Sequence, residues 1–233
     1  MKRFFVFILL ISFSFNLVEA YSSNSVAAET SERFLDSFGG SGVYNKDTEF
    51  LSFNEIVGKG KGEALPNNFW DSVIRYFPDV KQLYISAYNV PSVPQLIQKL
   101  KSLKSLSLIG CNVEVLPASI GKLTSLEVLN LGNNKLKKLP KEIGDLKKLE
   151  SLYLNENKLS SLPVSIGNLK SLEMLNLSHN NLKKLHEKIR TLKKLNYLNL
   201  TDNQFPENYF KNVLSTNFTK SSLDQGVYVR KSD

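Results

Sequence analysis

The chain has 233 residues, 42% of them hydrophobic, and carries 30 lysines and arginines against 22 acidic residues. This apolar content is enough for a core and excludes wholesale disorder, while the length suits one domain or one elongated array. The single cysteine, Cys111, excludes an internal disulfide, and with two scattered histidines it offers no metal-ligand spacing. The segment "GKGKGEALP" (58–66) does not match the spacing of a phosphate-binding loop. We therefore expect no metal and no cofactor.

The first twenty residues have the pattern of a cleaved export signal. Lys2 and Arg3 precede an apolar run, and Val18 and Ala20 stand at the minus-three and minus-one positions of a signal-peptidase site. An uncleaved membrane anchor is the alternative, but the run is short compared with the ~20 residues of a spanning helix. We expect residues 1–20 to be removed and the chain to be exported, as a secreted, periplasmic or cell-surface protein without a transmembrane span.

A polar stretch and then an apolar one follow the signal. Residues 21–49 are predicted to be a flexible polar linker, and residues 50–76 an N-terminal cap. In this cap Asn67 or Asn68 is a candidate N-cap for a helix. The apolar residues recur at helical spacing: Phe69, Trp70, Val73, Ile74 and Phe77. We expect this stripe to cover the first coil of the next region, although a partner-binding helix is the alternative.

Residues 77–205 repeat one leucine pattern, LxxLxxLxLxxNxLxxLPxxIGx, six times. The blocks begin every 23 residues, at Phe77, Leu100, Leu123, Leu146, Leu169 and Leu192. Such self-similarity predicts a solenoid, because each block can bury its leucines only against the next one. The LxLxxN core alternates apolar and polar residues, which indicates a half-buried strand.

These blocks resemble the leucine-rich-repeat family, in the class whose 23-residue repeat carries LPxxIGxL, as in Ras-scaffold repeats and many secreted bacterial proteins. The resemblance covers residues 77–205, about 55% of the chain. It implies an α/β solenoid: a horseshoe with a parallel concave sheet of about six strands, short helical or extended convex segments and a helical N-terminal cap. It also implies a non-catalytic module that binds another protein through the concave sheet.

An asparagine ends each of the last four predicted strands: Asn134, Asn157, Asn180 and Asn203. A buried amide carries donors and acceptors, so these side chains are predicted to form a ladder that satisfies backbone groups at the turn. Tyr88 and Cys111 hold this position in the first two blocks, and tyrosine there indicates an irregular first coil. In the fifth block His186 and Arg190 replace the proline and the glycine, and we expect His186 to be an exposed variant.

Side chains that flank the stacked leucines are predicted to point outward onto the concave face. This surface is almost uncharged and carries tyrosines, which dominate many protein-binding hot spots. Solvated strand surface without a partner is the alternative for any one position. The candidate partner-binding residues are Tyr84, Ser107, Asn130, Tyr153, Asn155, Met174, Asn176, Tyr197 and Asn199.

Basic residues provide a second hypothesis. Residues 77–205 hold 19 basic and 10 acidic side chains, a net +9, with lysines recurring at fixed template positions such as Lys137, Lys138, Lys183 and Lys184. Lysine-rich edges could bind a polyanion or a cell envelope, as an adhesin does, in a salt-dependent way. Nucleic acid is an unlikely partner because stacking aromatics are not interleaved among the lysines.

Ser178, His179 and Asp202 have the residue types of a hydrolase triad. A serine directly before the histidine makes the productive contact awkward, and nothing indicates an oxyanion hole, so we do not expect an enzyme. Residues 206–233 are predicted to be a C-terminal cap and tail. In this segment "DQGVYVRKSD" (224–233) either adds one strand or remains loose.

Overall fold

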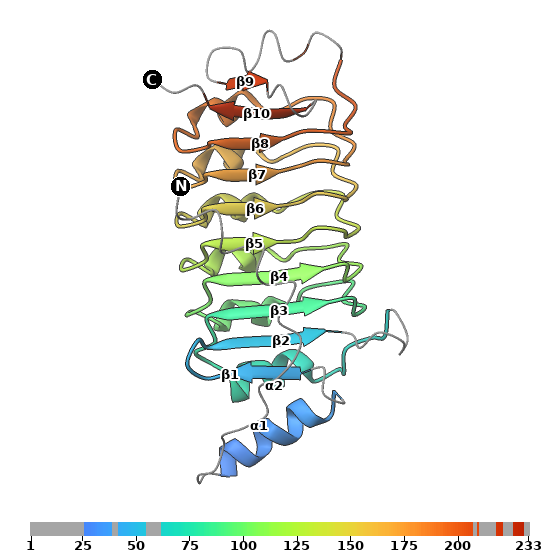
Figure 1. The fold of residues 1–233 in the computed structure, drawn as a ribbon, viewed down its shortest axis with the longest axis vertical. Helices are drawn as coiled ribbons and strands as arrows, with labels where there is room; N and C mark the ends of the chain where they lie inside the picture. The colour runs from blue at the N-terminus through green and yellow to red at the C-terminus, as the bar shows by residue number, and fades with distance from the viewer. Residues whose placement is uncertain are drawn as a thin grey trace.

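A single sheet of ten strands runs the length of the molecule, with the order β1-β2-β3-β4-β5-β6-β7-β8-β10-β9 (Figure 1). The computed structural model describes residues 26–38, 42–54, 62–206, 209, 218–220 and 226–230, so the expected export signal lies outside it. The strands are β1 (Gly42–Asn45), β2 (Phe50–Asn54), β3 (Gln82–Ser86), β4 (Ser105–Ile109), β5 (Val128–Asn130), β6 (Ser151–Tyr153), β7 (Met174–Asn176), β8 (Tyr197–Asn199), β9 (Phe218–Lys220) and β10 (Val227–Arg230).

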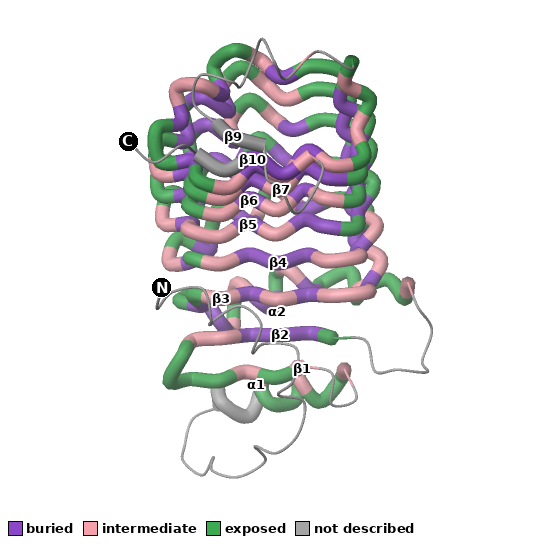
Figure 2. Tube along the Cα trace, turned by 45° about the horizontal axis from the view of Figure 1, so that its top comes forward, coloured by how far each residue is buried: buried purple, intermediate pink, exposed green. Residues whose placement is uncertain are grey.

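Strands β2 to β8 are parallel and pair without a change of register. One row of paired leucines consists of Leu51, Leu83, Leu106, Leu129, Leu152, Leu175 and Leu198, all essentially inaccessible to solvent. The sheet therefore contains the six expected strands, β3 to β8, and one further parallel strand, β2. Strands β1 and β10 pair antiparallel with the two ends of this stack, and β9 pairs antiparallel with β10. Buried residues recur at the same place in strand after strand (Figure 2).

Short 3-10 turns return the chain behind the sheet. They are η1 (Gln95–Lys99), η2 (Ala118–Lys122), η3 (Lys141–Asp145), η4 (Val164–Asn168) and η5 (Glu187–Thr191). An extended residue precedes each turn, and in the first four it is the proline of the repeat. His186 takes the same conformation, with φ −71° and ψ 141°, and its Nδ1 accepts a hydrogen bond of 3.2 Å from the Lys188 N–H. The histidine thus reproduces the proline geometry and adds a cap of its own.

The glycine of LPxxIG lets neighbouring turns approach closely. A Cβ atom at Gly121 would lie 2.5 Å from the carbonyl oxygen of Glu142 in the next turn, which no side chain allows. Gly144 and Gly167 meet the following turn in the same way. Arg190 belongs to η5, and among the described residues no later 3-10 turn packs over it.

The N-terminal end is closed by an aromatic cluster. Helix α1 (Val26–Asp36) and helix α2 (Phe69–Tyr76) meet there. The Phe34 ring lies 5.8 Å from the Phe53 ring, and Phe38 lies 4.7 Å from Phe53. Phe69 is fully buried between them. The predicted apolar stripe of α2 therefore covers the first coil.

One expectation for this end differs from the structure, and a second is confirmed in position only. Residues 21–49 were expected to be a flexible linker, yet they contain α1 and β1, because Phe34, Leu35 and Phe38 pack on the core. Asn68 stands at the N-cap of α2, but its side chain makes no capping hydrogen bond there.

The C-terminal end is closed by β10, whose Val227 and Tyr228 are each 5% exposed. Segment 224–233 thus adds a strand, the first of its two expected fates. Phe205 is half-buried against the core and stacks on Tyr209 at 5.1 Å. Residues 210–217, which belong to the predicted C-terminal cap, lie outside the described residues. Within the described ranges, no helix has the length and apolar character that crossing a bilayer requires.

Candidate functional site

The candidate residues of the concave face fall into columns across the strands. Register pairs Tyr84 with Ser107, and then Asn130, Tyr153, Asn176 and Asn199 in turn, so these six form one central column from β3 to β8. All are half-buried except Ser107, which is 9% exposed. Met174 and Tyr197 are paired in the neighbouring column, and Asn155 follows the end of β6.

Three asparagines of the central column also end their strands. The Oδ1 atom of Asn130 accepts a hydrogen bond of 3.0 Å from the Gly132 N–H. Asn176 and Asn199 repeat this contact with Ser178 and Thr201, at 3.1 and 3.0 Å. One side of each amide therefore serves the fold, which sequence reasoning missed. The sequence contained a signal for this contact, because an asparagine side chain commonly accepts a hydrogen bond from the backbone N–H two residues later.

A column of left-handed residues borders the face where the chain turns inward. Asn133, Glu156, His179 and Asp202 have φ between 52° and 55°, and Gly110 occupies the same place with φ 63°. This conformation is uncommon for residues with a Cβ atom and costs about 1–2 kcal/mol each. The left-handed residue turns the backbone inward, so that the residue after it, the ladder asparagine in most coils, lies in the interior.

The ladder asparagines bridge neighbouring coils. Asn134 Oδ1 accepts hydrogen bonds from the N–H groups of Cys111 and Val113, at 3.1 and 2.9 Å. Its Nδ2 donates to Leu108 and Leu131 carbonyls, at 2.6 and 2.9 Å. Asn157, Asn180 and Asn203 repeat the arrangement one coil later each time. The ladder therefore keeps the strand ends, and with them the outward columns, in line.

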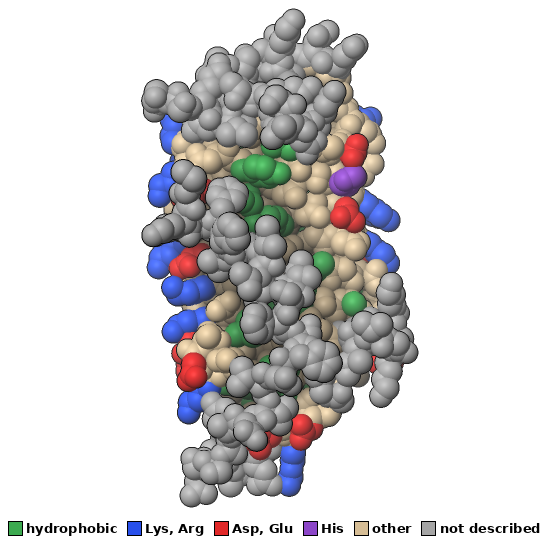
Figure 3. Space-filling view, in the orientation of Figure 1, with side chains coloured by type: hydrophobic (Ala, Val, Ile, Leu, Met, Phe, Trp, Pro, Cys, Tyr) green, Lys and Arg blue, Asp and Glu red, His purple; other side chains and the backbone are tan. Residues whose placement is uncertain are grey.

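Large side chains gather over β6 to β8. The Tyr153 hydroxyl lies 2.8 Å from Met174 Sδ, and Met174 pairs with Tyr197 on the next strand. Burial raises the pKa of the Tyr153 phenol above its usual value, against an opposing hydrogen bond with Ser151. Figure 3 shows hydrophobic side chains on the sheet face and lysine or arginine side chains along both of its edges. We call Tyr153, Met174 and Tyr197 the tyrosine–methionine patch.

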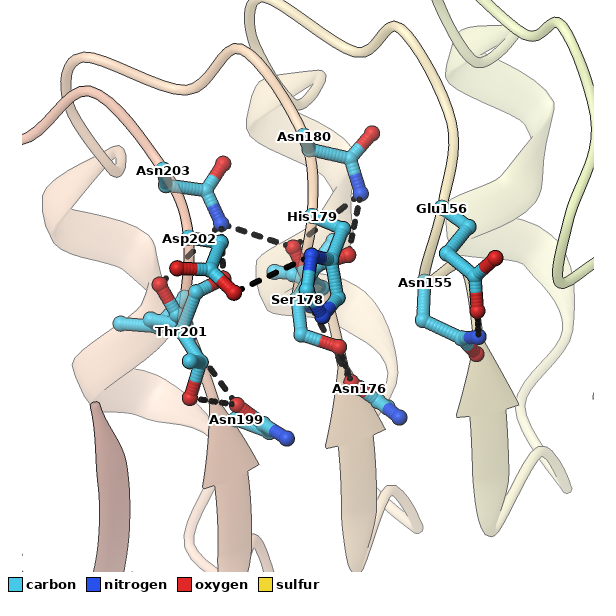
Figure 4. Close-up of polar contacts among 12 residues, drawn as sticks. Asn155, Glu156, Asn176, Ser178, His179, Asn180, Asn199, Thr201, Asp202 and Asn203 are labelled. Carbon is cyan, nitrogen blue, oxygen red and sulfur yellow. Dashed lines mark hydrogen bonds and ion pairs between the residues drawn. The ribbon is translucent and has the colours of Figure 1, made fainter. Parts of the chain in front are cut away.

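The residues of a possible triad are near one another but not arranged as one (Figure 4). The Ser178 hydroxyl donates to Asn176 Oδ1 at 2.9 Å. His179 Nδ1 instead lies 3.1 Å from Asp202 Oδ2, with both side chains more than half exposed. No hydrogen bond joins Ser178 to His179 in the part of the chain that the structure describes. The hydroxyl is thus directed to a structural amide rather than to a base.

Other kinds of site have little support. Among the described residues no group of three histidine, cysteine or acidic side chains could hold a metal ion. A pocket of about 470 Å³ lies between α2 and η1, lined by residues that include Asp71, Arg75 and Lys99, and no strand contributes to it. The buried Cys111 holds a ladder position, with Sγ 3.4 Å from the carbonyl oxygens of Ile85 and Ile109.

Comparisons with known proteins agree with the fold. A family description for a leucine-rich repeat region matches residues 129–217, and one for R13L1/DRL21 leucine-rich repeats matches residues 72–134. A leucine-rich-repeat protein of Leptospira interrogans has a similar structure, with 29% identity, a TM-score of 0.59, and coverage of 80% of this chain and 42% of that one. A TDR receptor is similar at 28% identity and a TM-score of 0.54, over 62% of this chain and 25% of the receptor. This chain thus spans less than half the length of either protein. A search of curated proteins gives no significant sequence match.

Proposed function

This chain belongs to the leucine-rich-repeat family, and we propose that it is a non-catalytic protein, secreted or exposed at a cell surface, that binds another protein through its concave sheet face. Proteins with this fold typically mediate protein–protein interaction. The proposal of export depends on the signal pattern of residues 1–20, and adhesion to a host or another cell is one role that such a protein could have.

One observation carries the proposal: the sheet presents an uncharged surface with large side chains across six register-matched strands. Tyr84, Tyr153 and Tyr197 combine broad apolar area with a polar tip and lose little conformational entropy on binding. Asparagine amides and small hydroxyls lie between them. This composition matches the centre of protein interfaces, where charged residues are depleted and tyrosine is enriched.

The side-chain contacts support the non-catalytic part of the proposal. The hydroxyl that could act as a nucleophile, Ser178 Oγ, donates to Asn176, and the face is an open surface rather than a pocket.

A second candidate function is binding of a polyanion or cell envelope through the lysine edges. Lys137, Lys138, Lys183 and Lys184 are all exposed, which favours it. Ser160 and Ser161 occupy the equivalent places between them, so the basic stripe is interrupted. For this reason the sheet face remains the first candidate.

A capture experiment with three baits tests both candidates. The baits are the wild-type chain, the Tyr153→Ala/Tyr197→Ala variant and a variant with the four lysines changed to glutamine. For the sheet face, we expect the tyrosine variant to lose its partner by about thirtyfold in affinity, equivalent to ~2 kcal/mol. The lysine variant and 0.5 M salt should have little effect. Loss with the lysine variant and in salt would instead support the second candidate, and partners unaffected by either variant would refute both.

A further inference from the structure

We propose that the part of the concave face over β6–β8 binds an extended segment of the partner protein in which a large apolar side chain is flanked by lysine or arginine. This inference rests on the proposed function and specifies the chemistry of its partner. It follows from the charges that surround the tyrosine–methionine patch.

Four carboxylates border this patch, and we call them the acidic frame. Glu150 and Glu173 directly precede β6 and β7, and Glu156 and Asp202 lie in the left-handed column beyond the strand ends. All four are exposed. Neither Glu150 nor Glu173 has an ion-pair partner among the described residues, whereas Asp202 Oδ2 lies 3.1 Å from Nδ1 of His179, the residue between Glu156 and Asp202 in the left-handed column. The frame is thus an acidic surface in a repeat region whose net charge is +9.

Two template lysines close in sequence to Glu150 and Glu173 have partners away from this frame. Lys147 Nζ donates to the Gly144 carbonyl in η3. Lys170 Nζ donates to the carbonyl and hydroxyl of Thr191, at 3.3 and 3.0 Å, at the end of η5. Both side chains therefore extend toward the 3-10 turns and away from the sheet face.

The other end of the face has no such frame. Lys81 pairs with Glu49 at 2.7 Å, and Lys104 pairs with Glu127 at 3.1 Å, so acidic and basic groups compensate each other before β3, β4 and β5. Beyond the ends of β3 and β4 the border residues are Ala87 and Gly110, which carry no charge. The charge along the concave face is therefore asymmetric, and only the β6–β8 end selects a cationic ligand.

The dimensions fit an extended chain. Glu156 lies six positions after Glu150, which at ~3.3 Å per residue gives a width of at most about 20 Å. A segment of about six residues that crosses the patch brings its flanking side chains to the two sides of the frame. Its central side chain meets Tyr153, Met174 and Tyr197. A second copy of this chain is a poor occupant, because two chains that each carry a net charge of +8 repel each other as they approach.

A peptide-display selection tests the inference. The full chain is exposed to a library of random 12-residue peptides, and the enriched sequences are measured against two quadruple variants. The frame variant is Glu150→Gln/Glu156→Gln/Glu173→Gln/Asp202→Asn. Its control changes the same number of carboxylates away from the strands: Glu114→Gln/Glu142→Gln/Asp145→Asn/Glu187→Gln.

We expect enriched peptides to contain an aromatic or large aliphatic residue beside lysine or arginine. Their affinity should fall about five- to tenfold for the frame variant and in 0.5 M salt, because exposed ion pairs are individually weak and screened. The control should stay within about twofold of wild type. Binding that needs Tyr153 and Tyr197 but shows no preference for basic peptides overturns the acidic frame and leaves the sheet-face proposal standing. Failure to enrich any peptide also overturns this inference, while the capture experiment above decides the proposed function separately.

Discussion

Removal of one ladder amide should destabilise the fold by an amount that the hydrogen bonds determine. Asn157 is 7% exposed, and its Oδ1 accepts a hydrogen bond of 3.0 Å from the Leu136 N–H. Its Nδ2 donates to three carbonyl oxygens, those of Leu131, Leu154 and Asn155, at 2.8, 3.2 and 3.2 Å. Asn157→Ala removes all of these contacts at once.

The consequences for donor and acceptors differ. Each of the three carbonyls keeps a second donor at 2.8 to 2.9 Å, from Asn134 Nδ2, Asn180 Nδ2 and the Asn133 N–H respectively. Only the buried Leu136 N–H loses the one acceptor that it has among the described residues, which costs about 1–3 kcal/mol. With about 1 kcal/mol for the lost bridge between coils, we expect a decrease of about 2–4 kcal/mol in the free energy of unfolding.

Urea unfolding and scanning calorimetry measure this effect, with a decrease of roughly 5–12 °C in the midpoint temperature for a chain of this size. The matched control is Asn168→Ala, because Asn168 is exposed at the end of η4. Asn157→Asp should cost more than Asn157→Ala at neutral pH, because it places a carboxylate among carbonyl oxygens. If Asn157→Ala unfolds within about 0.5 kcal/mol of the control, the hydrogen-bond account of the ladder is wrong.

Two further predictions concern packing and pH. Gly121→Ala should destabilise the protein by about 1–3 kcal/mol, because the new Cβ meets the backbone of the next turn. Lys122→Ala, at an exposed neighbouring position, should leave the stability unchanged, and thermal unfolding of the two variants measures the difference. Burial raises the pKa of the Cys111 thiol from 9.0 to about 11. The folded state thus disfavours the thiolate. The contribution of the neutral thiol to the free energy of unfolding is therefore fully present below about pH 9 and is lost as the pH rises toward 11. The unfolding free energy of wild type minus that of Cys111→Ala should fall by about 2 kcal/mol over this range, and a constant difference would contradict the assignment.

The repeating part of the fold is predictable because its physical causes are periodic. A leucine can be buried only against the equivalent leucine of the next block, so spacing alone indicates β3 to β8 and their register. The ends are harder to predict because they have no period. Phe34 and Phe38 lie in a segment rich in serine and acidic residues, and their burial depends on Phe53 and Phe69, which come from separate elements.

The candidate site was predictable in position but not in detail. Outward columns follow from strand alternation, yet the sequence does not say that Asn130 binds the Gly132 N–H or that Lys147 extends toward η3. These contacts depend on side-chain rotamers and on backbone turns, which the repeat template leaves open. The charge asymmetry of the concave face is visible only when they are known.

The central column contains residues whose side chains hydrogen-bond to the backbone and one residue, Tyr153, that does not make this contact. In β5, β7 and β8 an asparagine caps the N–H two residues later, but in β6 Tyr153 stands at that place and the Asn155 N–H has no acceptor among the described residues. Tyr153 thus forgoes a hydrogen bond that its neighbours make, and places a ring on the surface instead. A residue that departs from the local rule in this way is one expected to serve function.

Tyr153→Asn tests this reasoning against Tyr153→Ala. Both variants should lose the partner, because both remove the ring. In Tyr153→Asn the new amide should accept a hydrogen bond from the Asn155 N–H. The free energy of unfolding of this variant should therefore be about 0.5–1.5 kcal/mol higher than that of Tyr153→Ala. Asn176→Ala provides the converse measurement, since it should lose a contact of the same kind. If the two Tyr153 variants are equally stable, the reasoning that tyrosine replaces a stabilising hydrogen bond here is wrong. If Tyr153→Asn binds the partner as well as wild type, Tyr153 does not contribute to binding, and the concave-face proposal loses its strongest residue.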